Sequence, residues 1–190
     1  MVDHRATVRA ILAGEREQFR ILIGEFQRLV SHIVFRMIPN ADDREDVCQE
    51  VFLKVYQNLA GFRFDCKLST WVGQIAYNTC LTARGKKQSV LEHTLSDGAL
   101  DIEREWSASD SSRPDMMCES DNTSEIIRRE IDSLHPIPGT ILVLFHLENL
   151  SLQQIAEIFG MPAGTVKSHL FRARKQLKER LAARYQWEQI

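Results

Sequence analysis

Apolar side chains recur every three or four positions along most of the chain, a period that predicts amphipathic helices. Gly14, Pro39 and Gly61 interrupt the pattern in the N-terminal half, and Ser69 can cap the helix that follows it. The pattern predicts helices over residues 2–13, 15–37, 42–59 and 70–83. No stretch of this half shows the strict alternation of a strand, so we expect it to be all-α.

The same period returns near the C-terminus. Ser124 can cap a helix over 125–134, the residues HPIPG at 135–139 interrupt the pattern, and a strongly apolar helix is expected over 140–147. Ser151 and Gln154 have the spacing of a capping box. The apolar face of the helix that they begin consists of Leu152, Ile155, Ala156 and Phe159.

A tight turn is expected at Gly160, where a left-handed helix end favours glycine, and Pro162 fits the first turn of a new helix. The inner stripe of that helix is predicted to be Val166, Leu170, Leu177 and Leu181. The side chains predicted to face outward are Thr165, Lys167, Ser168, Arg172 and Lys175. Two short helices joined by a glycine turn, the second one basic, predict a DNA-binding helix-turn-helix. The alternative is an ordinary amphipathic helix with a solvated basic face.

The net charge of −2 is distributed unevenly. Residues 85–123 carry 4 basic and 9 acidic side chains, whereas the segments before and after are slightly basic. This middle segment is rich in Ser and Asp and has no sustained period, so it predicts a flexible acidic linker. The fold class expected is therefore all-α, with two small helical domains joined by this linker.

Catalytic and metal-binding motifs are not recognisable in the sequence. The six histidines and four cysteines lack HxH, HExxH and CxxC spacing, and there is no nucleophile elbow or phosphate loop. Asp42 to Glu50 form a carboxylate cluster, but compensation of the helix dipole explains it better than general acid catalysis. We therefore expect no enzyme activity, metal or cofactor. No apolar run could span a membrane and no signal peptide is visible, so a cytoplasmic protein is expected.

Aromatic and basic residues alternate over 61–87. Phe62, Phe64, Trp71 and Tyr77 lie among cations that include Arg63 and Lys67. Aromatic rings on which unpaired bases stack, beside cations for the backbone, are typical of single-stranded DNA binding. The alternative is that Trp71 and Phe62 belong to the core.

Longer segments resemble one protein family. LSLQQIAEIFGMPAGTVKSHLFRARKQL is similar to the promoter-binding C-terminal domain of extracytoplasmic-function (ECF) RNA polymerase sigma factors, although LuxR-type response regulators share the turn. DREDVCQEVFLKVYQNLAGFR and LSTWVGQIAYNTCLTARGKK resemble region 2 of the same sigma factors. Together these segments identify the chain as a member of the ECF family. The HPIPG segment and His169 depart from the usual pattern.

The resemblance implies two DNA-binding sites. The recognition helix would bind the −35 element as duplex DNA through Thr165, Lys167, Ser168, Phe171, Arg172, Arg174 and Lys175. The loop and third helix would bind the melted −10 element and a flipped base. The residues implied there are Phe62, Arg63, Phe64, Lys67, Ser69, Thr70, Trp71 and Asn78.

The resemblance also implies protein partners. RNA polymerase core would be bound through its β′ coiled coil and β flap, with the coiled coil contacting Asp46, Gln49, Glu50 and Leu53. An anti-sigma factor would block these surfaces, with 51–56 and 141–145 as contact segments. The chain would act as a monomer or as a 1:1 heterodimer with that factor. The implied domains are region 2 over 1–87, a linker over 88–122 and region 4 over 123–190.

Two other functions remain open at this point. A helix-turn-helix regulator acting alone would be a dimer that binds a palindromic duplex tightly without polymerase. An enzyme using the carboxylate cluster would need a divalent metal and would lose turnover on Glu50→Gln. Only the sigma factor accounts for both halves of the chain.

Overall fold

The computed structural model describes residues 3–92 and 122–185, and all regular structure within these ranges is helical. The elements are α1 (His4–Leu12), α2 (Arg16–Met37), α3 (Asp42–Asn58), the 3-10 turn η1 (Leu59–Gly61), α4 (Leu68–Glu92), α5 (Asn122–Asp132), α6 (Pro136–His146), α7 (Leu152–Phe159) and α8 (Ala163–Tyr185). The predicted all-α class is confirmed. Over these ranges, no helix is both long and apolar enough to cross a bilayer.

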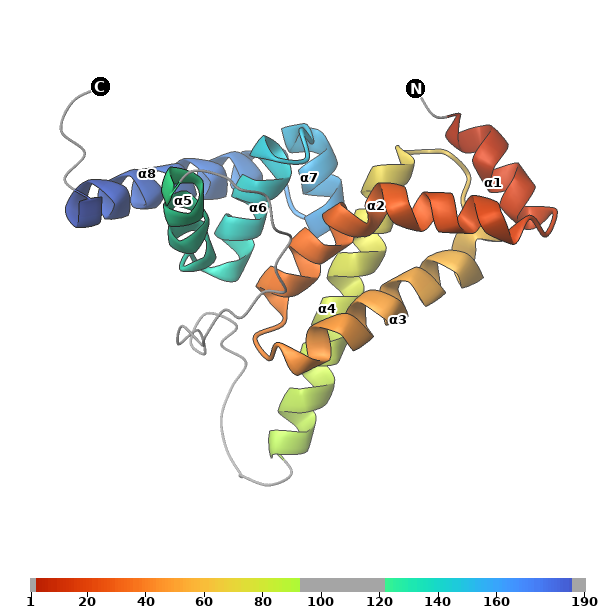
Figure 1. Ribbon diagram of the computed structural model, residues 1–190, viewed down its shortest axis with the longest axis horizontal. Helices are drawn as coiled ribbons and strands as arrows, with labels where there is room; N and C mark the ends of the chain where they lie inside the picture. Colours follow the sequence, from red (N-terminus) through yellow and green to blue (C-terminus); the bar gives the residue numbers. More distant parts are fainter. Residues whose placement is uncertain (1–2, 93–121, 186–190) are drawn as a thin grey trace.

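Helices α1 to α4 form an N-terminal bundle in which α2 contacts each of the other three helices. Figure 1 shows α2 and α3 running beside each other, with α4 crossing behind them. The predicted apolar stripes meet at the centre of this bundle, where Val30, Ile33, Val51 and Val55 are fully buried. Burial of these stripes, more than helix propensity, stabilises helices of this length.

Helices α5 to α8 form a C-terminal bundle around α6, which contacts α7 and α8. Ile141 and Leu144 of α6 are fully buried together with Ile155 and Val166. The segment 141–145, which we expected to contact an anti-sigma factor, is therefore buried except for the half-exposed Phe145. Ile141 and Leu144 are therefore not available to an anti-sigma factor in this arrangement, because α6 lies between α2, α7 and α8.

The two bundles contact each other through α2 with α6 and α4 with α7. Gly73 permits a close approach of α4 and α7, because a Cβ added there would lie 2.7 Å from Ile158 Cδ1. Arg36 of α2 donates hydrogen bonds to Asp132 Oδ1 at 3.0 Å and to the Ile131 carbonyl at 2.6 Å. The buried residues of both bundles thus form one continuous hydrophobic core.

Polar contacts add to this interface at Glu148, which follows α6. Its Oε1 accepts a hydrogen bond from Arg28 Nε at 2.9 Å and lies 2.9 Å from His32 Nδ1. The His32 hydrogen bond is the main cause of the lowered pKa of Glu148, and the charge of Arg28 adds to it. Glu148 is therefore held as a carboxylate between two α2 side chains.

Helix boundaries differ from the expected ones in two places. Helix α4 begins at Leu68, which leaves Ser69 inside the helix and not at its cap, and it continues past Gly85 to Glu92. Helix α6 begins at Pro136, so HPIPG starts a helix and does not interrupt one. Prolines fit a first helical turn, whose N–H groups have no intrahelical partner, and Gly139 leaves room for Arg36. Most of the expected linker, 93–121, lies outside the described residues.

Candidate nucleic-acid interface

The turn between α7 and α8 has helix-turn-helix geometry. Ser151 Oγ accepts a hydrogen bond from the Gln154 N–H at 3.2 Å, and the Gln154 side chain accepts one from the Ser151 N–H at 3.1 Å. Gly160 has a φ of 64°, in the left-handed region expected for it. Pro162 immediately precedes α8, and its carbonyl accepts a hydrogen bond from the Thr165 N–H at 2.9 Å. The sequence signals for this motif are confirmed to within one residue.

The first half of α8 presents an exposed polar and basic face. Phe171 is 68% exposed although it is large and apolar. Within this face, Ser168 Oγ donates to the Gly164 carbonyl at 3.0 Å, and Arg172 Nε lies 3.4 Å from the Ser168 carbonyl. All members of the predicted −35 set are exposed, namely Thr165, Lys167, Ser168, Phe171, Arg172, Arg174 and Lys175. Hydroxyls, cations and one exposed ring on a single helix suit phosphates, base edges and a thymine methyl group.

Arg174 lies on α8 but its guanidinium contacts the protein. Its Nη2 and Nε lie 2.9 and 3.1 Å from His146 Nε2, and its guanidinium carbon is 5.2 Å from the Phe145 ring centroid. Burial and the nearby Arg174 charge lower the pKa of His146, which favours the neutral imidazole that can accept these N–H groups. Arg174 would therefore have to leave His146 to reach a phosphate.

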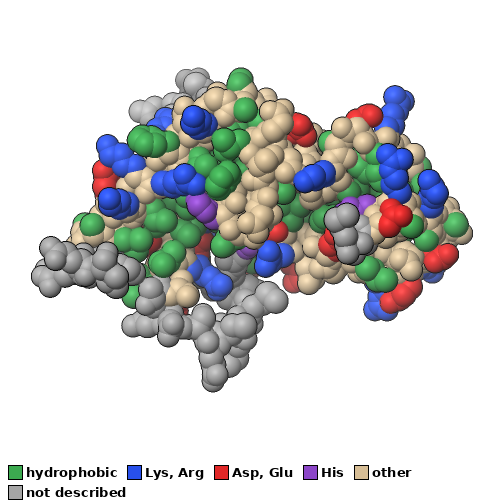
Figure 2. Space-filling model, turned by 90° about the horizontal axis from the view of Figure 1, so that it is seen from above, with side chains coloured by type: hydrophobic (Ala, Val, Ile, Leu, Met, Phe, Trp, Pro, Cys, Tyr) green, Lys and Arg blue, Asp and Glu red, His purple; other side chains and the backbone are tan. Residues whose placement is uncertain are grey.

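Two further arginines of α8 connect this helix to α5 and to the residue that follows it. Arg180 donates hydrogen bonds to Ser133, and Arg184 Nη1 lies 2.8 Å from Oε1 of the buried Glu130. The sequence indicated that this helix is basic, and Arg180 and Arg184 are part of its positive charge. Figure 2 shows Lys and Arg side chains over the C-terminal helices with few acidic neighbours, whereas both signs mix over the N-terminal helices.

The loop between η1 and α4 brings three of the predicted −10 residues into contact. The Phe62 ring centroid lies 4.5 Å from that of Phe64 and 4.9 Å from that of Trp71. Phe62 is buried, whereas Phe64 and Trp71 are half-buried. Tyr77 does not join this group, because its ring packs on Phe159 of α7 at 4.7 Å.

The polar members of the predicted −10 set are divided by the bundle interface. Arg63, Lys67 and Asn78 are exposed and Ser69 is half-buried. Thr70 is fully buried, with Gln154 Nε2 of α7 lying 3.5 Å from its Oγ1. Helix α7 therefore covers one part of the predicted strand site and leaves the rest accessible.

The predicted polymerase-binding residues lie on one face of α3. Asp46, Gln49 and Leu53 are exposed, and the half-exposed Glu50 pairs with Lys54 at 2.7 Å. Their spacing of three and four residues aligns them along the helix. Among the described residues, no group of three or more His, Cys, Asp or Glu side chains could hold a metal ion, so the α3 carboxylates do not converge.

Comparisons with known proteins agree with this geometry in both bundles. The family profile "Sigma-70 region 2" matches residues 22–90, and "Sigma-70, region 4" matches residues 124–177. The chain is 32% identical over 177 residues to the ECF RNA polymerase sigma-E factor of Escherichia coli (strain K12), covering 92% of each chain. It is 30% identical over 177 residues to the RNA polymerase sigma-H factor of Pseudomonas aeruginosa, covering 92% of this chain and 91% of that one.

The chain belongs to the ECF family of RNA polymerase sigma factors. Sigma factors are transcription initiation factors and not enzymes. The carboxylates of α3 therefore need no catalytic explanation. The region 2 match also decides between a sigma factor and a regulator acting alone, because the helix-turn-helix is common to both classes.

Two solved structures share this fold. The sigma factor RpoE, in a co-crystal structure with the anti-sigma factor NepR from Bartonella quintana, matches with a TM-score of 0.69 and 20% identity, covering 88% of this chain and 99% of that chain. CnrH, in complex with the cytosolic domain of CnrY, matches with a TM-score of 0.62 and 17% identity, covering 95% and 97%.

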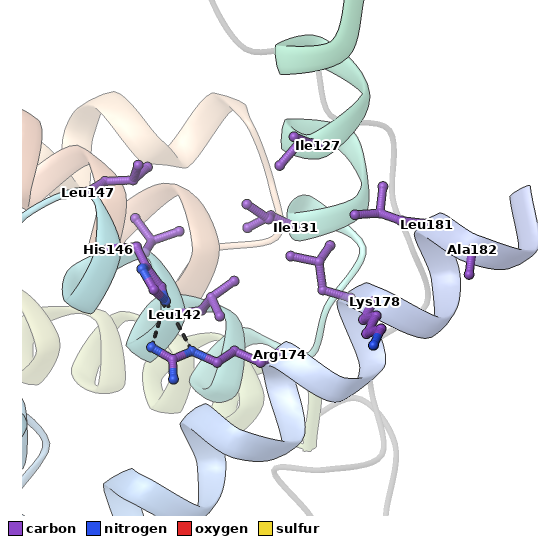
Figure 3. A pocket seen from close by; sticks show the side chains of 11 residues that line it. Ile127, Ile131, Leu142, His146, Leu147, Arg174, Lys178, Leu181 and Ala182 are labelled. Carbon is purple, nitrogen blue, oxygen red and sulfur yellow. Dashed lines mark hydrogen bonds between the residues drawn. The ribbon is translucent and has the colours of Figure 1, made fainter. Parts of the chain in front are cut away.

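Sequence reasoning missed an apolar groove between α5, α6 and α8 of this sigma factor (Figure 3). The groove has a volume of about 580 Å³ and Arg174 and Lys178 among its lining residues. Leu177 and Leu181, which we expected in the core, are only half-buried there. The apolar members of its lining are Ile127, Ile131, Leu142, Val143, Leu147, Leu177, Leu181 and Ala182. The stripe of α5 and the second half of the α8 stripe were the sequence signals for it.

The described cysteines differ in expected reactivity. Burial raises the pKa of the Cys48 thiol to about 11 and that of Cys80 to about 12, while Cys66 is less buried. The thiolate is the nucleophile. At pH 8 the thiolate fraction of Cys48 and of Cys80 should be at least about 100-fold lower than that of an ordinary thiol. We expect iodoacetamide to label Cys66 first and Cys80 only after unfolding, as measured by peptide mass spectrometry. Rapid labelling of Cys80 in the folded chain would contradict its burial. Cys118 lies outside the described residues.

Proposed function

We propose that this sigma factor binds RNA polymerase core and directs it to promoters, where it binds the −35 element as duplex and the −10 element as a melted strand. One observation carries the proposal. The chain presents an exposed recognition helix in one bundle, and in the other an aromatic group flanked by cations. A duplex-binding regulator acting alone needs the first surface but not the second.

At the −35 element, α8 would lie in the major groove. Arg172 and Lys167 supply the cations for guanine edges or phosphates, and Phe171 the apolar contact for a thymine methyl group. A bidentate arginine–guanine contact contributes about 1–3 kcal/mol of discrimination between bases.

At the −10 element, the aromatic group would stack an unpaired base, and Asn78 on the same side of α4 as Trp71 would bind its edge. Helix α4 places Trp71, Ile75 and Asn78 along one side by their spacing. Because the site binds the flipped strand and not the closed duplex, binding itself would shift the equilibrium toward open DNA.

The protein partners proposed are those of the family. The α3 face of Asp46, Gln49, Glu50 and Leu53 would bind the β′ coiled coil of the polymerase. The apolar groove, with cations at its edge, suits an amphipathic helix such as one from the β flap. An anti-sigma factor would compete for these surfaces in the cytoplasm, as a 1:1 complex.

The proposed domains, region 2 over 1–87, a linker over 88–122 and region 4 over 123–190, would have to separate on the promoter. The centres of the two elements lie about 25 base pairs apart, or about 85 Å of B-form duplex. A compact chain of this length has a radius of gyration of about 16 Å. The packed arrangement of α4 against α7 therefore cannot bind both elements at once, and it also covers Thr70.

The test is in vitro binding to RNA polymerase core, followed by transcription from a genomic fragment library. We expect the wild type to bind core and initiate at defined sites. Arg172→Ala should reduce promoter recruitment roughly 10- to 100-fold. Asn78→Ala should allow recruitment but lower strand opening, measured by permanganate reactivity of unpaired thymines. Arg16→Ala, which removes an exposed cation of α2, is the control. A chain that ignores core but binds a palindromic duplex by itself would instead be a lone regulator.

A further inference from the structure

A row of planar side chains extends from α4 across the loop to α1. It continues the aromatic group of Trp71, Phe62 and Phe64 by one more member, Arg5, whose guanidinium carbon lies 4.9 Å from the Phe64 ring centroid. Arg5 lies outside residues 22–90, to which the region 2 profile is confined. It was not among the residues that the sequence implied for DNA binding.

The backbone of Phe64 is strained in a way that needs an explanation. Its φ is 62°, and Asn149 is the other non-glycine residue with a positive φ in the described part of the chain. A bulky side chain rarely adopts this region, because its Cβ approaches the following carbonyl oxygen. Such strain persists where neighbours hold it, and it is concentrated at functional sites. Phe62 and Arg5 are the ring and the cation that contact Phe64 here.

Arg5 projects from a helix that is fixed to the bundle. The Asp3 carboxylate caps α1 by accepting a hydrogen bond from the Arg5 N–H at 3.0 Å, and His4 Nε2 lies 2.7 Å from Glu25 Oε1 of α2. Val8 and Ile11 are buried. The side chain of Arg5 is exposed and can move, whereas its backbone is already fixed, so binding does not have to order the backbone.

Around the row, three cations outnumber the one acidic residue of the loop, Asp65, which suits a nucleic-acid strand. Arg63 and Lys67 are exposed cations of the loop, and Arg5 adds a third from a separate element. A guanidinium can stack on a ring and can also form paired hydrogen bonds with a phosphate, which a lysine ammonium cannot do.

We propose that Arg5 and Phe64 together form a nucleotide-binding position of the melted −10 strand, which extends the strand site onto α1. An unpaired base takes the place of the guanidinium on the Phe64 ring, and the displaced guanidinium binds the phosphate of that nucleotide. The exchange replaces a cation–ring contact with charge-assisted hydrogen bonds. This inference rests on the proposed function, since it assumes that the loop binds a single strand.

The test measures binding of holoenzyme, assembled from core and the full chain, to a fluorescent single-stranded oligonucleotide. The oligonucleotide carries the non-template −10 sequence of a promoter found in the fragment library. Arg5→Gln should weaken binding about 10-fold and reduce the slope of log K against log salt by about 0.7, the value for one lost phosphate contact on a single strand. Arg5→Lys should keep the slope but lose part of the affinity.

Arg9→Gln is the matched control, because it removes another exposed arginine one turn further along α1. It should change the affinity less than 2-fold. In a Phe64→Leu background, which keeps the bulk but removes the aromatic face, Arg5→Gln should lose less affinity than in the wild type.

Three results would overturn the inference. In the first, Arg5→Gln binds the oligonucleotide as tightly as Arg9→Gln does. In the second, Arg5→Gln loses as much affinity in the Phe64→Leu background as in the wild type. In the third, Arg5→Gln lowers the thermal unfolding midpoint of the chain enough to account for the lost binding. Asn78→Ala separates this inference from the proposed function. If Asn78→Ala weakens strand binding while Arg5→Gln does not, only the role of Arg5 fails. If neither variant matters, the −10 function itself fails.

Discussion

Replacing Leu53 with lysine should weaken binding to RNA polymerase core by at least about 30-fold, equivalent to about 2 kcal/mol. Leu53 is 56% exposed on α3, one helical turn from Gln49 and Glu50. The neighbouring Tyr56 is also large and exposed, so the face combines an apolar patch with carboxylates. Such a face fits a partner that offers an apolar contact surrounded by basic side chains.

The substitution has two effects on the complex and little effect on the fold. It removes an apolar side chain from the proposed contact, and it places a positive charge opposite a basic surface. Lysine is a good helix former, and a cation in the second half of a helix does not oppose the dipole, so the free energy of unfolding should change by less than about 0.5 kcal/mol.

The measurement is equilibrium binding of labelled chain to core, with Leu12→Lys as the control. Leu12 is 53% exposed at the end of α1, so the same substitution is made at an equally exposed leucine outside the α3 face. The control should bind core within about 2-fold of the wild type. Equal binding by Leu53→Lys and the wild type would show that the polymerase binds elsewhere.

Replacing Gly73 with leucine should separate the two bundles. Even a Cβ at this position would lie 2.7 Å from Ile158 Cδ1 and 2.9 Å from Ile158 Cγ1, so a whole leucine side chain cannot fit between α4 and α7. Overpacking of this kind costs about 1–3 kcal/mol. Here the chain can avoid the cost by moving α7 away, which exposes Thr70 and breaks the stacking of Tyr77 on Phe159.

If the packed arrangement competes with polymerase binding, Gly73→Leu should raise the apparent affinity for core. A penalty of 1–3 kcal/mol on the packed state shifts its population by about 5- to 150-fold. The gain in affinity is limited by how much of the wild-type chain is packed. Small-angle scattering should show a larger radius of gyration, and circular dichroism should show unchanged helix content.

Gly24→Leu is the matched control. Gly24 also lies inside a helix, but nothing lies within 4 Å of a Cβ added there. Leucine has the higher helix propensity, so this variant should be more stable by a few tenths to about 1 kcal/mol without a change in scattering. If Gly73→Leu scatters like the wild type, Ile158 can rearrange within the interface and the packed state tolerates the change. If it gains size but no affinity for core, the packed state does not compete with the polymerase.

Helix boundaries show where sequence signals were sufficient. The capping box at Ser151 and the glycine at Gly160 act within a few residues, and the structure confirms both. Ser69 and the HPIPG segment carry signals of equal strength, yet Ser69 lies inside α4 and HPIPG begins α6. In these cases packing against other helices decided the ends, because a polar residue or proline is compatible with either a cap or a first turn.

The candidate sites show the same division. Exposure of Lys167 and Arg172 followed from the helical period of α8, because the apolar stripe on the same helix fixes which face is buried. The helical period did not predict the contacts that Arg174, Arg180 and Arg184 make with other parts of the C-terminal bundle. Their partners are 28 or more residues away in the sequence. Tyr77 likewise looked available for a base until Phe159 was found against it.

The sequence by itself therefore determined the helices, the helix-turn-helix and membership in the sigma factor family, all of which depend on periodicity, caps and motifs within short segments. Only the tertiary structure decided how the two bundles pack, which cations remain free, that Arg5 meets Phe64, and that a groove forms between α5, α6 and α8. The physical reason is that local conformation is set by neighbours along the chain. Side-chain pairing across helices depends on which faces meet, and many pairings satisfy the same apolar pattern.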